Sequence, residues 1–214
     1  MCITQYGARM VKLIVPPPPK PRDQIISLGI DLAGRRLAWC VSNVDKLIAV
    51  AHFEAKKAEG NRAAEIVQCT EQLLAGIEGH EIDEVYIEEP YIGHSTQSSL
   101  QLAHMCGAVL QVLGATTQLK PQLVPVSTWK KQVLGKGSLD KEGIIAWLET
   151  NHPEWLDECR YLSPTGLDRI NQDRADAICV SRMAFVERGQ RLGRARVRRS
   201  RASDRPQRMV RPVA

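Results

Sequence analysis

Three separated places in the sequence hold carboxylates that could act together on divalent cations. Asp31 lies inside an apolar run, Glu88 ends a second apolar run, and Asp173 and Asp176 stand three residues apart where a helix is expected to begin. Oxygen-rich, histidine-poor sites suit Mg²⁺ or Mn²⁺. Two such ions about 4 Å apart can activate a water and stabilise the leaving oxygen of a phosphodiester. We therefore predict a hydrolytic metal site.

Each acid taken alone also has an ordinary explanation. A buried carboxylate such as Asp31 costs several kcal/mol unless it is paired, protonated or metal-bound, but backbone N–H groups at a strand end can satisfy it. Glu88 could be a solvated strand end, and acids suit a helix N-terminus. Because successive strand side chains face opposite sides, Glu88 and Glu89 cannot both face one site. Carboxylates brought together would repel, unless cations offset their charge.

The elements that must position these acids follow from hydrophobic patterning and turn residues. Strands are expected at residues 25–32, 37–41, 47–53, 84–88 and 122–126. Helices are expected at residues 62–77, from Ser95 or Thr96 to 113, and at 127–134, 140–149 and 173–187. This order predicts an α/β fold in which a five-stranded mixed sheet, three antiparallel strands and then parallel ones, is flanked by helices.

Composition narrows the class of protein. The chain has 214 residues, 43% of them hydrophobic, which excludes a disordered or collagenous chain. Residues 90–119 lack Asp, Glu, Lys and Arg but carry glutamines and histidines that would be costly in lipid. No membrane span and no secretion signal is recognised, so a cytoplasmic location is expected, in a bacterial host if the chain is phage-encoded. The six scattered cysteines are expected to be reduced core residues.

The two ends differ from the middle of the chain. Residues 188–214 hold ten arginines and one acid, a net charge of +9, which leaves −4 for residues 1–187. We expect residues 188–214 to form a disordered tail that attracts a polyanion, or else a solvated end that aids solubility. Residues 1–24 are expected to form an N-terminal arm with a proline-rich spacer, and residues 25–187 the domain.

Over residues 25–185 the chain resembles the RuvC family of Holliday-junction resolvases, nucleases of the ribonuclease H-like fold. The resemblance rests on four motifs: Gly29-Ile30-Asp31, Tyr86-Ile87-Glu88-Glu89, the segment Val124–Lys141 and Asp173-Arg174-Ala175-Asp176-Ala177. The third motif is the most specific, because a lysine on a helix, a Gly-x-Gly-Ser loop and a second lysine follow one another as they do in the family.

The resemblance implies a metal-dependent endonuclease whose catalytic and metal-binding acids are Asp31, Glu88, Asp173 and Asp176. It implies two Mg²⁺ ions per active site, with Mn²⁺ also supporting activity. It further implies a homodimer that nicks two strands of a four-way junction symmetrically, with forks and flaps as further branched substrates. A two-fold dimer suits a two-fold substrate.

Six residues are predicted to contact DNA. Lys130 and Lys141 match the two lysines of the family, and their alternative is a solvated helix surface. Tyr91 aligns with an aromatic residue that contacts bases at the junction centre, and its alternative is partial packing. The start of the helix at Ser95 and Thr96 and the glycine-flanked loop that holds Lys136 can both approach a phosphate.

The chain also departs from the family pattern. Leu32-Ala33-Gly34 stands where family members often have Pro-Gly after the first aspartate, and Asn151–Leu167 is longer than the usual connection before the last helix. In this respect the chain is similar to bacteriophage-type RuvC-like proteins, in which sequence preference can be relaxed.

Other functions can place similar acids on such a sheet. A ribonuclease H-like enzyme acting on RNA–DNA hybrid or RNA is one alternative, although the Lys130–Lys141 segment favours the junction enzyme. A non-catalytic DNA-binding protein on the same fold is a second, although all four acids are retained. An actin-like ATPase needs a duplicated domain, for which 214 residues leave no room.

Overall fold

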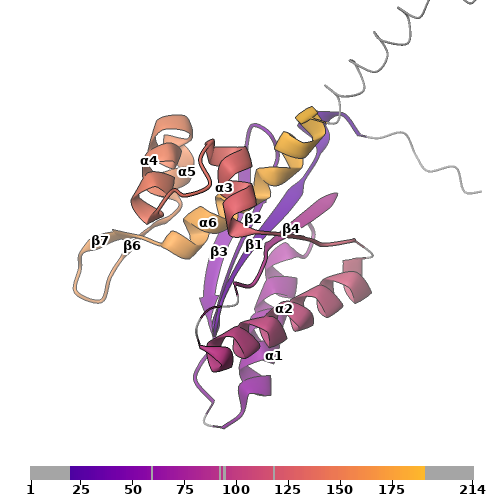
Figure 1. Ribbon diagram of the computed structural model, residues 1–214, viewed down its shortest axis with the longest axis vertical. Coiled ribbons are helices and arrows are strands. Elements are labelled where there is room, and N and C mark those ends of the chain that lie inside the picture. The colour runs from indigo at the N-terminus through magenta and orange to yellow at the C-terminus, as the bar shows by residue number, and fades with distance from the viewer. Residues whose placement is uncertain (1–19, 59, 92, 94, 118, 191–214) are drawn as a thin grey trace, which may run out of the picture.

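The computed structural model describes residues 20–190 except 59, 92, 94 and 118 (Figure 1). Five strands form one sheet in the order β3-β2-β1-β4-β5. Their bounds are β1 Ser27–Ala33, β2 Arg36–Ser42, β3 Leu47–Glu54, β4 Glu84–Glu88 and β5 Gln122–Val124. β2 pairs antiparallel with both β1 and β3, whereas β4 runs parallel to β1 and β5 parallel to β4. The predicted five-stranded mixed sheet is confirmed.

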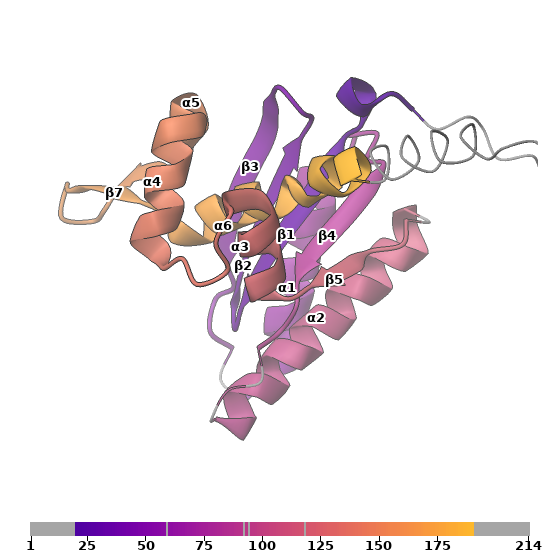
Figure 2. The same cartoon turned by 45° about the horizontal axis from the view of Figure 1, so that its top comes forward.

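Helices cover both faces of this sheet (Figures 1 and 2). One face packs against α1 (Arg62–Ile77) and α2 (Thr96–Thr117), and the other against α3 (Val126–Leu134) and α6 (Gln172–Ser181). Helices α4 (Lys141–Asn151) and α5 (Pro153–Asp157) lie outside α6, and a 3₁₀ turn η1 (Arg22–Gln24) precedes β1. The strands β6 (Arg160–Leu162) and β7 (Asp168–Ile170) form a separate hairpin before α6.

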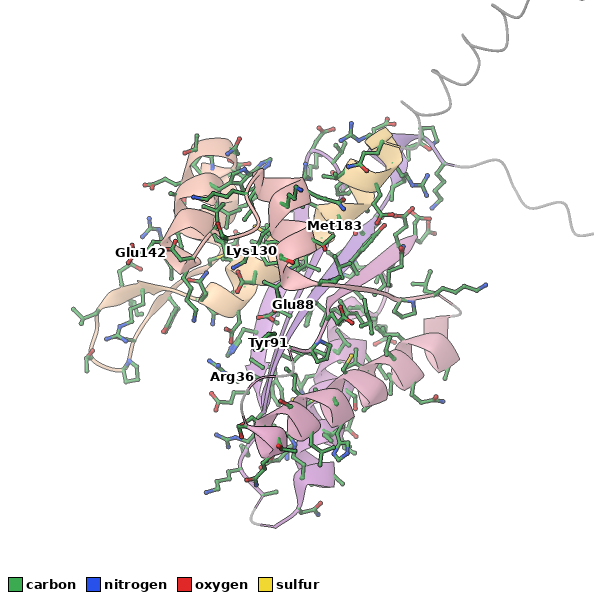
Figure 3. The ribbon with its side chains drawn as sticks, in the orientation of Figure 1. Arg36, Glu88, Tyr91, Lys130, Glu142 and Met183 are labelled. Atoms are coloured by element: carbon green, nitrogen blue, oxygen red, sulfur yellow. The ribbon has the colours of Figure 1, made fainter. Side chains whose placement is uncertain are left out.

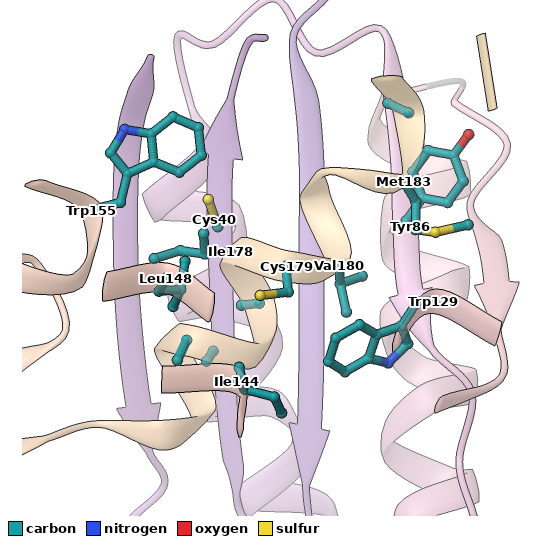
Figure 4. Close-up of a cluster of buried hydrophobic side chains, with 14 of the residues drawn as sticks. Cys40, Tyr86, Trp129, Ile144, Leu148, Trp155, Ile178, Cys179, Val180 and Met183 are labelled. Atoms are coloured by element: carbon teal, nitrogen blue, oxygen red, sulfur yellow. The ribbon is translucent and has the colours of Figure 1, made fainter. Parts of the chain in front are cut away.

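Two apolar clusters hold these layers together. The cluster on the α6 side includes Trp129, Trp155 and Ile178, all of which are fully or almost fully buried. Figure 4 shows Ile178, Cys179 and Val180 of α6 at its centre, with Trp129 and Trp155 on either side. The five cysteines within the described residues are buried and free, in agreement with their expected place in the core.

Most predicted elements are confirmed, and the differences lie at their ends. The bounds of α1 and β4 agree with prediction, whereas α2 extends four residues beyond the predicted Leu113. β5 was expected to reach Val126 but stops at Val124, because Pro125 lacks an N–H group and takes the position before the first turn of α3. The last helix is interrupted by a turn at residue 182 and is helical again at residues 183–190.

The two ends of the described part meet at the start of β4. Lys20 Nζ lies 2.8 Å from Asp83 Oδ1, and Arg188 Nε donates to Glu84 Oε1 at 2.7 Å. Lys20 and Arg188, which lie just outside the expected domain limits of 25 and 187, therefore contact residues of the domain. The expected proline-rich spacer and most of the arginine-rich tail lie outside the described residues. No helix in residues 20–190, gaps aside, is long and apolar enough to cross a membrane.

Gly29 on β1 sets how closely α6 approaches the sheet. A Cβ atom at this position would lie 2.4 Å from Ala177 O and 2.3 Å from Ser181 N, both on the α6 backbone. At the same turn of α6, the Ser181 and Ser42 hydroxyls form a fully buried hydrogen bond of 2.8 Å. Only glycine therefore allows β1 and α6 to pack at this distance.

We predict that Gly29→Ala moves α6 away from β1 and lowers the free energy of unfolding by about 3 kcal/mol or more, the upper end of overpacking costs. Chemical denaturation measures this loss. Gly107→Ala is the matched control, because a Cβ at that exposed position of α2 meets no atom within 4 Å. Equal stability of Gly29→Ala and the wild type would contradict the close approach.

Candidate active site

Asp31 and Glu88 lie side by side on neighbouring parallel strands. Ile30 of β1 pairs with Ile87 of β4, so Asp31 and Glu88 occupy the next positions of the same register. Neighbouring strands are about 4.8 Å apart. Two positions before Asp31, the Gly29 backbone contacts α6, and two positions before Glu88, the Tyr86 side chain packs in the cluster on the α6 side. The sheet therefore directs both carboxylates toward the α6 side, where Asp31 is only 6% exposed.

The first turn of α6 brings the other two acids to the same edge of the sheet. Asn171 caps the helix by accepting a hydrogen bond from Arg174 N at 2.9 Å, so that Asp173 and Asp176 are both in or next to the first turn. Asp176 precedes Ala177, whose carbonyl lies against Gly29. The four predicted acids are thus gathered at the carboxyl ends of β1 and β4.

Three of these acids have raised pKa values. Burial raises the pKa of Asp31 well above its usual range, and the charges of Glu88 and Asp176 raise it further. Burial also raises the pKa of Glu88, although a hydrogen bond from Trp129 Nε1 at 2.9 Å opposes this rise. Burial and the charge of Glu88 raise the pKa of Asp176 to about 7, and its Oδ1 atom is buried without a hydrogen-bond partner.

Asp173 has a different environment from the other three acids. Its Oδ2 atom lies 3.3 Å from His52 Nε2 and 3.3 Å from Arg36 Nη1. The contact with His52 and the charges of Arg36 and Lys141 lower the pKa of Asp173. His52, Ala38 and Asp31 are register partners across β3, β2 and β1, so His52 belongs to the same row of the sheet as the buried acids.

The residues fit divalent cations chemically, although the side chains are not yet arranged as ligands. Among residues 20–190, apart from the gaps, no three His, Cys, Asp or Glu side chains already form a metal site. Asp173 is engaged by Arg36 and His52, and Glu88 by Trp129. However, three of the four neighbouring carboxylates have raised pKa values, and Asp176 Oδ1 is buried without a hydrogen-bond partner. A bound cation would offset the repulsion between these groups.

The predicted lysines border the acids to different degrees. Lys130 Nζ donates to Leu139 O at 2.7 Å and lies 5.6 Å from the centre of the Trp129 ring. Its charge lowers the pKa of both Glu88 and Asp176, and Figure 3 shows it near Glu88. Lys141 begins α4 and lowers the pKa of Asp173, whereas Lys136 is exposed just after α3.

The other predicted DNA contacts lie between the end of β4 and the start of α2, in the segment that follows Glu88. Tyr91 follows Glu88 by three residues and is 74% exposed. Ser95 caps α2 by accepting a hydrogen bond from Ser98 N at 3.3 Å, and Thr96 is the exposed first residue of that helix. A cleft of about 470 Å³ adjoins this loop, lined by Glu89, Pro90, Tyr91, Pro125, Val126, Ser127 and Gly137. A larger hollow of about 750 Å³ at the far end of α1 is remote from the acids.

Three residues of the site were not predicted from the sequence. Trp129 orients Glu88, while Arg36 and His52 hold Asp173. Trp129 stands inside the quoted motif between Val124 and Lys141, so its position was visible but its hydrogen bond was not. A histidine in the apolar run of β3 was the available signal for His52.

Comparison with known proteins identifies the family. The chain is 32% identical over 125 residues to the crossover junction endodeoxyribonuclease RuvC of Sulfurovum sp. (strain NBC37-1), covering 55% of this chain and 74% of the relative. The chain belongs to the RuvC family. The RuvC of Caulobacter sp. (strain K31) is 32% identical over 120 residues, covering 55% of this chain and 70% of that protein. No family model matches the chain.

Solved RuvC structures share the fold. The Thermus thermophilus RuvC structure has a TM-score of 0.58 and 15% identity, covering 77% of this chain and 97% of that one. The same RuvC in complex with Holliday junction substrate has a TM-score of 0.58 and 13% identity, covering 78% and 97%. The predicted RuvC resemblance and ribonuclease H-like fold are confirmed, while the bacteriophage-type likeness stays a prediction.

The raised pKa values predict that the metal-free protein loses stability as pH rises. The pKa of Asp176 is raised to about 7 in the folded state, whereas an Asp in an unfolded chain has a pKa near 3.9. Between these two pH values the folded state therefore binds more protons than the unfolded state. We expect the Tm in EDTA to be lower at pH 8 than at pH 5.5. Mg²⁺ or Mn²⁺ should raise the Tm more at pH 8, because the cation replaces the proton.

Asp176→Asn separates this effect from other titrations. The variant should be more stable than the wild type in EDTA at pH 8 and should gain less from metal. The lowered pKa of Asp173 contributes stability that is lost only as pH falls below about 4, so it does not act in this window. A wild-type Tm that rises from pH 5.5 to 8 in EDTA and does not respond to metal would contradict the account.

Proposed function

We propose that this protein is a divalent-metal-dependent endonuclease that resolves four-way DNA junctions, with forks and flaps as further substrates. The observation that carries the proposal is the gathering of Asp31, Glu88, Asp173 and Asp176 at one edge of a RuvC-type sheet. The two relatives described above, which this chain matches over 74% and 70% of their length, are named crossover junction endodeoxyribonucleases.

The four acids would hold the metal, for which we propose two Mg²⁺ ions, with Mn²⁺ as a functional substitute. Asp31, Glu88 and Asp176 would bind it through their carboxylate oxygens, and Asp173 would exchange its pairing with Arg36 and His52 for the cation. When bound, such ions activate a water and stabilise the leaving oxygen of the phosphodiester.

The surrounding residues position the acids and the substrate. The Trp129 indole N–H donates to one oxygen of Glu88 and so orients the carboxylate. Lys130 and Lys141 would each pair with a phosphate oxygen and offset the charge of the DNA near the acids. The cleft beside Tyr91 would accept the strand next to the cleaved bond, with Ser95, Thr96 and Lys136 as further phosphate contacts.

We also propose that two copies act together on one junction. The exposed side of α2 carries no charged side chain, and Leu100 on it is 54% exposed. A symmetric pair of helices would bury this surface and place two active sites on a two-fold substrate. The arginine-rich tail would add sequence-independent attraction to the DNA backbone.

Cleavage of labelled substrates tests the proposal directly. The purified protein should cut a four-way junction with Mg²⁺ and not with EDTA, and more efficiently than linear duplex or RNA–DNA hybrid. Asp31→Asn should reduce the cleavage rate at least about 10³-fold because a metal ligand is lost, while junction binding persists. Denaturing gels measure the rate, and mobility shifts measure the binding.

Asp45→Asn is the matched control, because Asp45 is exposed in the turn between β2 and β3, far along the sheet from the acids. Its cleavage should equal that of the wild type. Undiminished cutting by Asp31→Asn would remove Asp31 from the mechanism. Preferred cutting of the hybrid would favour the ribonuclease H-like alternative.

A further inference from the structure

The β6–β7 hairpin lies within and just beyond the segment that is longer than the usual family connection. It leaves the body after α5 and returns into α6, and within the described residues its two strands pair only with each other (Figure 1). The register pairs are Arg160 with Ile170, Tyr161 with Arg169 and Leu162 with Asp168. The function proposed above does not use this arm.

The arm has a defined shape at its tip. Ser163 is buried, and its hydroxyl accepts a hydrogen bond from Leu167 N at 3.1 Å and bonds to Thr165 Oγ1 at 3.0 Å. The backbones of Ser163 and Leu167 are joined at 2.9 Å, and Gly166 N donates to Ser163 O. An isolated two-stranded hairpin is marginally stable, so these bonds are what hold the loop in one conformation.

The root of the arm is fastened to α6. Asn171, the cap of α6, donates its backbone N–H to Cys159 O at 2.8 Å, and Arg174 Nη1 donates to Glu158 O at 2.9 Å. Cys159 and the neighbouring Leu156 are buried in the core. The position of the arm is therefore coupled to the helix that carries Asp173 and Asp176.

The two faces of the arm differ in charge. On one face, Arg160 is neutralised by Asp157 at 3.0 Å and Asp168 at 2.9 Å. On the other, Tyr161 and Arg169 are direct cross-strand partners, and both are exposed, Tyr161 by 42%. Within the described part of the chain, no carboxylate pairs with Arg169. This face thus presents an aromatic ring beside a guanidinium without a carboxylate partner. An aromatic ring can stack on a base, and a guanidinium can pair with a backbone phosphate.

Arg169, on this face, is also close in sequence to the acids of α6. Arg169 precedes Asp173 by four residues, which span at most about 14 Å. This distance corresponds to about four base steps of a DNA strand at 3.4 Å each. Arg169 therefore lies within about four nucleotides' length of a phosphate held at the acids.

We propose that Tyr161 and Arg169 form a DNA-binding site on the arm, which holds the substrate strand a few nucleotides from the cleaved bond. Arg169 pairs with a backbone phosphate, and the ring of Tyr161 stacks on a base that is unpaired or unstacked near the branch. The proposal rests on the proposed function for its ligand, and both residues are binding and positioning residues.

Equilibrium binding of a labelled four-way junction in EDTA, over a salt series, tests this site with the full-length chain. Arg169→Ala should weaken binding about ten-fold and reduce the slope of log K against log salt by about one, and Arg169→Lys should restore the slope. Tyr161→Ala should weaken binding about ten-fold with an unchanged slope, and Tyr161→Phe should bind as the wild type does.

Lys120→Ala is the control, since Lys120 is an exposed cation just before β5, at the opposite end of the sheet from the acids. It should bind the junction as the wild type does. The hairpin site is rejected if the double variant Tyr161→Ala/Arg169→Ala binds as tightly as the wild type, if Lys120→Ala loses as much affinity, or if the loss follows a change from dimer to monomer mass. Failure of the wild type itself to bind or cut branched DNA would instead reject the proposed function.

Discussion

The structure depends on the electrostatic cost of gathering four carboxylates at one partly buried place. Burial of Asp31 and the charges of its neighbours raise its pKa, and Asp176 ionises only near pH 7. The contacts of Asp173 with Arg36 and His52 and the indole N–H donated to Glu88 offset part of this cost. Each arrangement leaves the acids available to a metal, because a proton or a side-chain partner can be exchanged for a divalent ion.

The rest of the fold keeps this cluster in place. The parallel register of β1 and β4 fixes Asp31 beside Glu88, and the contact of Gly29 with the α6 backbone sets the height of Asp173 and Asp176 above the sheet. The apolar face of α6 is enclosed by the cluster that contains Trp129 and Trp155, so the helix cannot move without breaking the core. Stability and the geometry of the site are therefore carried by the same packing.

Much of this arrangement was predictable from the sequence, and the remainder shows what sequence patterns lack. The strands, α1 and the four acids follow from periodicity and from carboxylates in apolar surroundings, such as Asp31. The partners Arg36 and His52 were not predicted, because their contact with Asp173 depends on strand pairing across three strands rather than on local spacing. The hairpin was missed because strands of three residues are too short to show alternation. The end of β5 was misjudged because an apolar run continues through Pro125 into the first turn of α3.

The central claim is that these acids, and not some other group, bind the divalent cation. A crystal of the wild-type protein soaked in Mn²⁺ above pH 7.5 tests it most directly through anomalous scattering. The account predicts Mn²⁺ peaks within coordination distance, about 2.0–2.4 Å, of oxygens from Asp31, Glu88 and Asp176, with Asp173 turned away from Arg36. Mn²⁺ bound elsewhere, or four carboxylates unchanged at saturating metal, would contradict it.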